Sequence, residues 1–258
     1  MSNPWNGADA LAVVVEGGPT DTGGCLVDDA TVGAGPRAAA DLDRGIALLR
    51  EVASGTRPPT LRLYRPSPTV AFGQRDARLP GFAAAGRAAE ERGFTPLVRR
   101  AGGRAAAYHD GCLVVDHLEP AADGVAGTRA RFAAFGGFFA AVLARVGVDA
   151  HVGEVPGEYC PGEFSVHGRR EGVPAVKLVG TAQRVISGAW LFSSVVVVED
   201  ATPLRAVLSD VYAALGLDWL PSTAGGAEDL APGLAVHDVE QALLAAYAAV
   251  VRLDPASA

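Results

Sequence analysis

Lysine is nearly absent from this chain of 258 residues. Lys177 is its single lysine, and the other 21 of its 22 basic residues are arginine. An excess of alanine, glycine and arginine is typical of a GC-rich coding bias, which replaces lysine wherever arginine serves. Lysine is a compact charge with a tunable pKa, whereas arginine keeps its proton and carries a broad planar fork. The survival of Lys177 therefore favours a specific role, and a chance position on a solvated surface is the alternative.

Cysteines are few, and long apolar runs are missing. Cys25, Cys112 and Cys160 are odd in number and widely spaced, which suits neither a disulfide framework nor a structural zinc site, so we expect no metal centre. No stretch approaches the ~20 consecutive apolar residues of a membrane span. The first ten residues have neither the basic nor the apolar region of a secretion signal. We expect a cytoplasmic protein without a membrane partner.

Positive charge is also in deficit. The formal net charge is −7, and no run of basic residues offers a footprint for nucleic acid. We therefore expect no nucleic-acid partner.

Hydrophobic periodicity predicts strands and helices that do not alternate regularly. The expected strands are 11–16, 60–64, 69–72, 94–100 and 113–118, and the expected helices are 37–52, 81–92, 129–146, 203–215 and 235–253. Residues 163–199 are expected to form strands and turns. This order favours an α+β fold with mixed or antiparallel sheets flanked by helices over a doubly wound parallel sheet. The segment after the loop 220–233 is too short for a domain, so we predict a single domain over 1–258.

The first candidate motif lies between two expected strands. It reads Arg-Arg-Ala-Gly-Gly-Arg-Ala over 99–105, followed by Tyr-His-Asp over 108–110. Glycines at a strand end let the backbone approach a ligand closely, and successive free N–H groups there form an anion-binding nest. Alone, this signal is weak, because a Gly-Gly pair is more often a plain turn and a lone histidine more often a structural one.

The second motif surrounds Cys160 and reads Glu-Tyr-Cys-Pro-Gly-Glu-Phe over 158–164. Pro161 favours an extended backbone at Cys160, and the Pro-Gly pair favours a turn, so the sulfur is expected where a loop meets a strand. An inert buried thiol is the default for a cysteine, but this loop setting favours a reactive one. Cys112 lies in an apolar strand and is interpreted as core.

The third motif, Lys-Leu-Val-Gly-Thr-Ala-Gln-Arg over 177–184, contains the single lysine. Lys177 and Val179 share one face if this segment is a strand, and Gly180 opens the wall of side chains where a substrate could pass. A hairpin at 169–172 between Cys160 and Lys177 would let the two side chains meet.

These motifs resemble the superfamily of lipoate-protein ligases, octanoyltransferases and biotin-protein ligases. The Arg-Arg-x-Gly-Gly-Arg-Ala segment followed by His-Asp resembles its acyl-binding loop, and Lys-x-x-Gly-x-Ala-Gln resembles its lysine motif. Residues 59–64 and 70–74 are similar to strands upstream of that loop, so the resemblance covers about 38–200, with C-terminal helices over 201–253. Tyr-Cys-Pro-Gly before the lysine motif is most similar to the cysteine-dependent octanoyl and lipoyl transferases. The resemblance implies the catalytic domain of that superfamily.

The resemblance also implies roles for individual residues. Cys160 would carry the acyl group as a thioester, and Lys177 would favour its thiolate and orient the acyl carbonyl. The acyl tail would lie in an apolar tunnel lined by residues such as Val70, Phe72 and Val179. The remaining substrate-binding residues would be Arg99, Arg100, Gly102, Gly103, Arg104, His109, Asp110, Gly180, Ala182 and Gln183.

The implied partners are lipoyl-carrier domains, namely the glycine cleavage H protein or E2 subunits of 2-oxoacid dehydrogenases, and acyl carrier protein is a further possible donor. No cofactor is expected beyond the octanoyl or lipoyl group that is transferred.

Three alternatives stay open. In an ATP-dependent lipoate ligase, Lys177 would hold an acyl-adenylate and Cys160 would be a bystander. Residues 101–104 read Ala-Gly-Gly-Arg where such ligases usually have Ser-Gly-Gly-Gly. The additional C-terminal domain of the larger ligases is also not recognised in this sequence, and both differences weaken the ligase interpretation. A non-catalytic binder of lipoyl or biotinyl groups would not need both Cys160 and Lys177. A Cys-His hydrolase using His109 would leave the lysine motif without a role.

Overall fold

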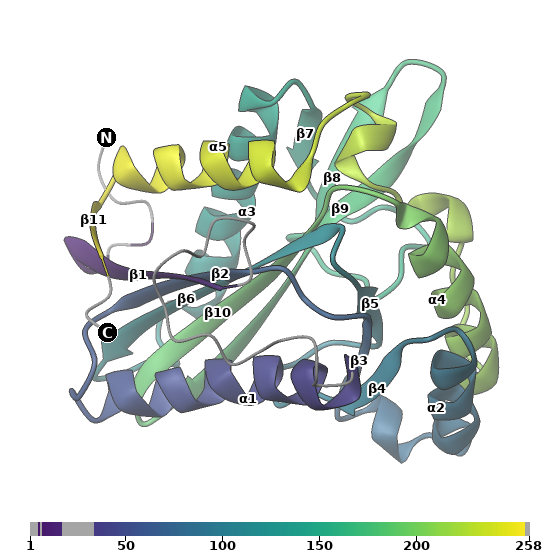
Figure 1. Cartoon of the computed structure of the whole chain (residues 1–258), viewed down its shortest axis with the longest axis horizontal. Coiled ribbons are helices and arrows are strands. Elements are labelled where there is room, and N and C mark those ends of the chain that lie inside the picture. The colour runs from purple at the N-terminus through teal and green to yellow at the C-terminus, as the bar shows by residue number, and fades with distance from the viewer. Residues whose placement is uncertain (1–4, 6, 17–33, 256–258) are drawn as a thin grey trace.

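The computed structural model describes residues 5, 7–16 and 34–255, and Cys25 lies outside them. In this described part the chain forms an eight-stranded sheet, a three-stranded sheet and five α-helices (Figure 1). In spatial order, the large sheet contains β11 (Arg252–Pro255), β1 (Ala10–Glu16), β2 (Thr60–Tyr64), β6 (Cys112–Ala121), β10 (Gly188–Val197), β9 (Val173–Ile186), β8 (Val166–Arg170) and β7 (Asp149–Val152). The small sheet contains β4 (Thr95–Val98), β3 (Thr69–Phe72) and β5 (Ala106–Tyr108). The helices are α1 (Ala34–Ala53), α2 (Phe82–Glu91), α3 (Thr128–Arg145), α4 (Ala201–Leu215) and α5 (Val236–Ala248).

The large sheet is mixed. Strand β1 runs parallel to both of its neighbours, β11 and β2, and every other pair in this sheet is antiparallel. In the small sheet, β3 is parallel to β4 and antiparallel to β5. The predicted α+β fold with mixed sheets flanked by helices is confirmed.

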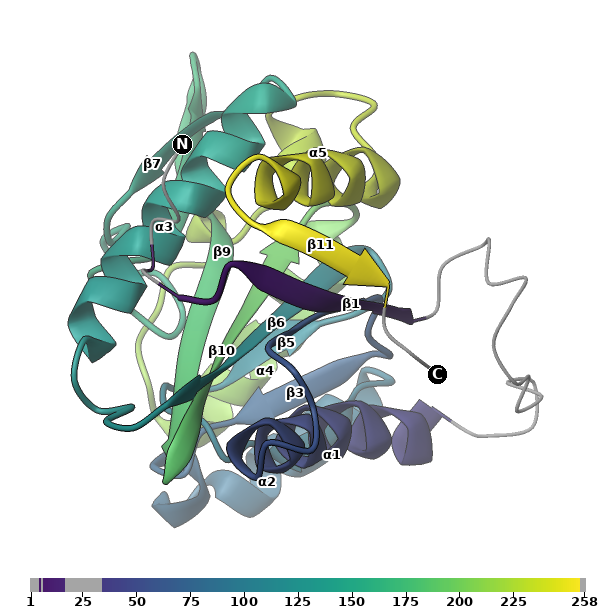
Figure 2. The same ribbon diagram turned by 90° about the vertical axis from the view of Figure 1, so that its left-hand side faces the viewer.

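Helices cover both faces of the large sheet. Helices α3 and α5 pack together on one face, and α1 lies along the opposite face against β6 and β10 (Figure 2). The small sheet lies on the α1 side, where α2 and α4 pack against each other and against its strands (Figure 1). The fold therefore has two apolar layers separated by the large sheet, with the small sheet closing one end.

The two central strands, β6 and β10, are buried on both faces, and their alternation sorts side chains between the layers. Leu113, Phe192 and Val196 point to the core under α3 and α5. Val114 and Val195, one position along and paired across the strands, point to the α1 side. A sheet covered on both faces favours such continuous apolar runs, and it leaves the α1 side free to form a cavity.

The structure corrects the predicted C-terminal helix over 235–253. Helix α5 ends at Ala248, and β11 begins at Arg252. The Arg252 backbone N–H donates to the Asp9 carbonyl at 2.9 Å, and Ala10 and Arg252 are register partners. Pairing with the edge of a sheet outweighs the weak local preference for helix, as tertiary context often does.

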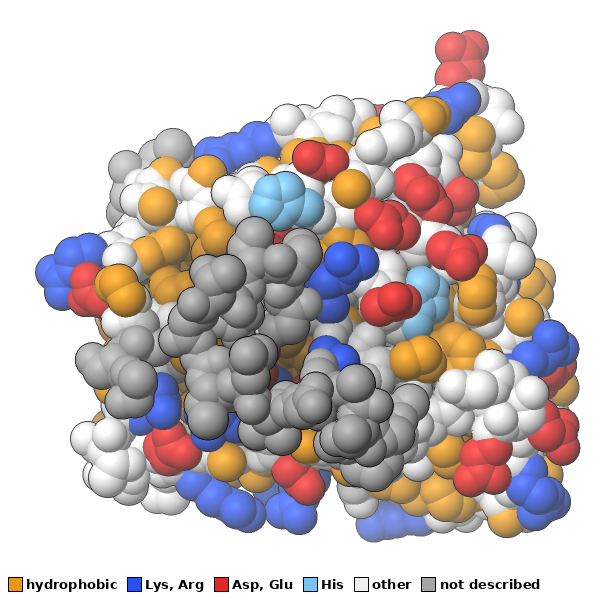
Figure 3. All heavy atoms as spheres, viewed as in Figure 1, with side chains coloured by type: hydrophobic (Ala, Val, Ile, Leu, Met, Phe, Trp, Pro, Cys, Tyr) orange, Lys and Arg blue, Asp and Glu red, His pale blue; other side chains and the backbone are white. Residues whose placement is uncertain are grey.

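Two short strands, β5 and β7, are absent from the prediction, because β5 is rich in alanine and β7 lies at an edge of the sheet. Among the described helices, none is long and apolar enough to cross a bilayer. On the face seen in Figure 3, basic and acidic side chains lie interspersed among apolar ones.

Candidate active site

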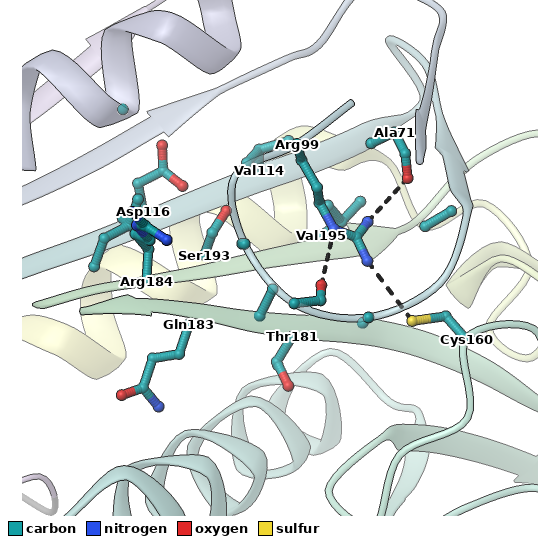
Figure 4. A pocket seen from close by; sticks show the side chains of 18 of the residues that line it. Ala71, Arg99, Val114, Asp116, Cys160, Thr181, Gln183, Arg184, Ser193 and Val195 are labelled. Carbon is teal, nitrogen blue, oxygen red and sulfur yellow. Dashed lines mark hydrogen bonds between the residues drawn. The ribbon is translucent and has the colours of Figure 1, made fainter. Parts of the chain in front are cut away.

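A cavity of about 590 Å³ lies between α1, the α1 side of the large sheet and the loop that joins β4 to β5. Its walls are largely apolar and include Tyr64, Val114, Phe132, Leu191 and Val195. In Figure 4, Cys160 lies on one side of this cavity, while Asp116 and Ser193 lie on the other. The volume falls within the roughly 300–1,000 Å³ of pockets that bind small molecules.

The polar wall opposite Cys160 is an ion-paired network in which Arg62 faces the carboxyl groups of Asp116, Glu16 and Asp41. The carboxylate of Asp116 accepts a hydrogen bond of 3.2 Å from the buried guanidinium of Arg62, which also pairs with Glu16 at 2.6 Å. Burial raises the pKa of Asp116, and Arg62 opposes that rise. The wall therefore presents a paired carboxylate to the cavity.

Cys160 lies in the loop between β7 and β8 in a backbone conformation that is rare for a residue with a side chain. Its φ of 43° is left-handed, so the extended backbone predicted from Pro161 is wrong. Its N–H donates to the Tyr212 hydroxyl at 2.8 Å, and that hydroxyl donates to the Ala105 carbonyl at 3.0 Å. Burial raises the pKa of Tyr212, so the hydroxyl keeps the proton it donates. Strained backbone of this kind persists where surrounding contacts fix it, often at functional sites.

The Cys160 sulfur faces two N–H donors from the loop after β4. It accepts a hydrogen bond of 3.1 Å from the Arg104 backbone N–H, and Nη2 of Arg99 lies 3.8 Å from it (Figure 4). Gly103, at φ 102°, lies between them: a Cβ there would be 2.4 Å from Nη2 of Arg99 and 2.8 Å from Sγ of Cys160. Only glycine allows this approach.

The side chain of Arg104 points elsewhere. It donates to the fully buried Asp76 at 3.1 Å, and the other carboxylate oxygen of Asp76 accepts the Gly73 N–H at 2.9 Å. A Cβ on Gly73 would lie 1.9 Å from the Gly103 carbonyl oxygen. Asp76 and Gly73 therefore hold the glycine loop against the end of β3.

Lys177 is 2% exposed, and its ammonium contacts the backbone of the Cys160 loop. Its Nζ donates to the carbonyl oxygens of Cys160 at 2.8 Å and Tyr159 at 3.1 Å, and to the carboxylate of Glu158 at 3.3 Å. Between these two described residues, the structure has no hydrogen bond from Nζ of Lys177 to Sγ of Cys160. The ammonium therefore holds the loop, and the sulfur is contacted by other groups.

The cavity brings together most of the site residues predicted from the sequence. Its lining contains Cys160, Lys177, Arg99, Arg100, Gly102, Gly103, Gly180, Ala182 and Gln183. A Cβ on Gly180 would meet only Cε of Lys177, at 3.8 Å, so this position has room for a methyl group. The Gln183 side chain is engaged, because it accepts from Arg131 at 2.8 Å and donates to the Thr128 carbonyl at 3.3 Å.

Six predicted residues are absent from this lining: Val70, Phe72, Arg104, His109, Asp110 and Val179. The predicted tunnel residues Val70 and Val179 are fully buried in the two cores instead, which corrects that prediction. Phe72 is fully buried in the core with α2, since strand alternation turns Ala71 to the cavity and Phe72 away from it. Nδ1 of His109 accepts the Gly111 N–H at 2.8 Å, and its Nε2 then donates to the Asp200 carbonyl at 2.8 Å. His109 has a structural role in this arrangement, and the neighbouring Asp110 is exposed. A Cys-His hydrolase is not supported by this geometry.

Sequence reasoning missed three residues that position the site. Glu158 is buried and accepts hydrogen bonds from Val155 N–H, Gly162 N–H and Ser165 Oγ, besides its ion pair with Lys177. Tyr212, on α4, supports the Cys160 loop, and Asp76, in the turn after β3, supports the glycine loop that contains Gly103. Glu158, two residues before Cys160, was within reach of sequence analysis as the acidic partner of a single lysine. Tyr212 and Asp76 carried no comparable signal.

Cys112 is a buried thiol in β6, as predicted. Burial raises its pKa to about 12. In the described part of the chain, no group of histidine, cysteine and acidic residues is arranged to hold a metal ion.

Comparison with known proteins gives one family. The model of the lipoyl protein ligase A/B catalytic domain matches residues 38–248. Two similar proteins are named octanoyl-[GcvH]:protein N-octanoyltransferase. The protein from Exiguobacterium sp. (strain AT1b) is 30% identical over 60% of this chain and 54% of its own length, and that from Anoxybacillus flavithermus is 34% identical over 55% and 49%. The chain thus spans about half the length of these relatives.

Solved structures show the same fold. Lipoate-protein ligase A bound with ATP superposes with a TM-score of 0.63 at 17% identity, over 97% of this chain and 90% of that one. A structure of a bi-partite lipoate protein ligase and its E2 lipoyl domain from Thermoplasma acidophilum gives 0.59 at 18% identity, over 86% and 82%. At these identities the likeness concerns the fold.

Proposed function

The chain belongs to the family of the lipoyl protein ligase A/B catalytic domain, and on that premise we propose that it transfers an octanoyl or lipoyl group from a carrier protein to a lysine of a lipoyl domain. The observation that carries the proposal is Cys160 at the edge of the apolar cavity, with its sulfur against two N–H donors. An apolar cavity suits an acyl chain, and a sulfur held in this way suits a nucleophile. The names of the octanoyltransferase relatives agree with this reading.

The proposed reaction has two acyl-transfer steps. The Cys160 thiolate attacks the acyl carbonyl carbon, the bond from that carbon to the donor breaks, and the donor amine or thiol leaves with a proton from solvent. The amine of the acceptor lysine then attacks the thioester, the C–S bond breaks, and the proton lost by the amine restores the thiol. This is covalent catalysis by an activated cysteine.

No cofactor takes part in this proposal, because the carrier supplies an already activated or transferable acyl group. We propose the glycine cleavage H protein, an E2 lipoyl domain or acyl carrier protein as partners. Arg100 and Arg184 are exposed beside the cavity, and Arg184 donates to the Arg100 carbonyl at 3.4 Å. Two exposed guanidinium groups would favour an acidic carrier.

We also propose that residues 1–258 act as one catalytic domain in the cytoplasm. Strand β11 completes the large sheet, so the C-terminal segment is part of the same fold as the site. The cytoplasm keeps thiols reduced, which suits a catalytic cysteine.

The decisive test is intact-protein mass spectrometry with octanoylated H protein as donor and no nucleotide. We expect a gain of one octanoyl group on Cys160, followed by its appearance on an added lipoyl domain. Acylation of that domain only from free lipoate and ATP would contradict the proposal and favour the ligase. Absence of transfer under both conditions would favour a non-catalytic binder.

A further inference from the structure

The positive charge nearest the Cys160 sulfur belongs to Arg99. Its Nη2 lies 3.8 Å from Sγ, whereas the ammonium of Lys177 is hydrogen-bonded to the carbonyl oxygen of the same cysteine. The two cations therefore act on different atoms of one residue.

The surroundings of the two cations also differ in net charge. Lys177 is ion-paired with the buried carboxylate of Glu158 at 3.3 Å, so the pair contributes little field at the sulfur. Among the described residues, no carboxylate oxygen lies within 4.0 Å of a nitrogen of Arg99, although Arg104, Arg62 and others are paired in this way. The charge of Arg99 is thus available to an anion beside it.

Arg99 is also held in place before any reaction. Its guanidinium donates to the carbonyl oxygen of Ala71 at 3.1 Å (Figure 4). It also donates to the carbonyl oxygens of Gly102 at 3.0 Å and Arg104 at 2.8 Å. A guanidinium keeps its charge at any working pH. Donors fixed in advance stabilise developing charge without reorganising during the reaction, which makes them effective in catalysis.

We infer that Arg99, together with the Arg104 backbone N–H, forms the site that stabilises the Cys160 thiolate, and that Lys177 is a positioning residue that holds the Cys160 loop. The thiol proton leaves to solvent, and the charge left on Sγ is stabilised by these two donors. Once the sulfur attacks an acyl carbonyl, the same donors lie beside the reacting atoms, which makes Arg99 a catalytic residue. That last consequence rests on the proposed acyl transfer, but the thiolate site itself exists in the free protein.

The test is the rate at which iodoacetamide alkylates Cys160 in the full chain, followed by intact mass across a pH series. We expect Arg99→Gln to slow alkylation about tenfold or more, as for the loss of one charge-assisted hydrogen bond, and to move the pH profile to higher pH. Arg99→Lys keeps the positive charge but not the planar guanidinium group. Its alkylation rate should therefore fall between those of the unchanged protein and Arg99→Gln. Arg92→Gln removes an exposed arginine that pairs with Asp210, and should react like the unchanged protein.

The double variant Lys177→Met/Glu158→Gln removes the buried ion pair as a unit, and a thermal melt shows which variants fold. We expect the double variant to shift the pH profile less than Arg99→Gln does, because the pair has little net charge and its loss affects the sulfur only through the position of the Cys160 loop. If Arg99→Gln alkylates at the unchanged rate, or faster because the loop has opened, the inference is overturned. It is equally overturned if only the double variant shifts the profile. Alkylation by iodoacetamide needs neither an acyl donor nor an acceptor lipoyl domain. A failed acyl-transfer assay would therefore count against the proposed function alone.

Discussion

Nζ of Lys177 and the carbonyl oxygen of Cys160 lie 2.8 Å apart, so the single lysine is hydrogen-bonded to the backbone of the cysteine. The sulfur of the same cysteine points away from Lys177, toward Arg99. The hydrogen bond from Lys177 helps fix Cys160 in its left-handed conformation, with Tyr212 holding the N–H of the same residue. Lysine suits the position because a compact ammonium can donate to two carbonyls and a carboxylate in an enclosed space.

Substitution of Lys177 tests that requirement. Lys177→Arg should lower the rate of acyl transfer roughly a hundredfold or more, because the wider fork cannot fit between Glu158 and the loop. Lys177→Met should do the same and destabilise the fold by about 3–5 kcal/mol, because it leaves the buried carboxylate of Glu158 without a counter-charge. Initial rates and thermal melts measure both effects.

The double variant Lys177→Met/Glu158→Gln is the control for stability. It should recover much of the lost stability without recovering transfer, and coupling between the two sites follows from a double-mutant cycle. Unchanged transfer in Lys177→Arg would show that the position tolerates any cation.

The three cysteines should differ sharply in function. Cys160→Ala should abolish transfer, whereas Cys112→Ala should leave it largely intact, as should Cys25→Ala, which lies outside the described residues. Initial rates of transfer to a lipoyl domain give the comparison. Full activity in Cys160→Ala would exclude the thioester and favour the ligase.

Labelling should separate Cys160 from Cys112 independently of activity. Burial raises the pKa of Cys112 to about 12 from 9.0, so its thiol keeps its proton at neutral pH and should resist iodoacetamide in the folded protein. Because the raised pKa favours the protonated thiol in the folded state, its contribution to stability is present below about pH 9 and is lost as the pH rises toward 12. Peptide mapping after labelling, with and without denaturant, measures the difference, and equal labelling of both thiols in the folded protein would contradict it.

The neighbouring glycines offer a matched pair. Gly103→Ala should reduce transfer strongly, because its φ is 102° and its Cβ would meet both Arg99 and Cys160. Gly102→Ala adds the same methyl group where nothing lies within 4 Å, so its effect should be much smaller. Transfer rates and alkylation of Cys160 should follow the same order, and equal losses in the two variants would show that loop flexibility, rather than close approach, is what matters.

The preference for acyl chains of a given length should depend on Val195, a residue of β10 that lines the cavity (Figure 4). Val195→Phe should disfavour octanoyl donors more than butyryl donors, because the larger ring fills space that a long tail needs. Val195→Ala should preserve octanoyl transfer. Competition between the two donors, read by mass, gives the preference. An unchanged preference in Val195→Phe would place the acyl tail elsewhere.

The sequence by itself determined the fold class and the segments that meet at the site. Regular periodicity located the long helices and central strands, and the motifs around 99–104, Cys160 and Lys177 were recognisable because glycine, proline and a single lysine each have few substitutes. The short strands β5 and β11 could not be predicted from the sequence, because their pairing depends on distant partners rather than on local preference.

Only the tertiary structure decided which atoms touch. A separation of 17 residues let Lys177 reach Cys160, but it could not say whether the ammonium meets the sulfur or the carbonyl. The left-handed backbone at Cys160 and the buried carboxylate of Glu158 decide that, and strand alternation turns Ala71 rather than Phe72 toward the cavity. Backbone conformation and burial arise from contacts across the whole fold, which is why local spacing could not specify them.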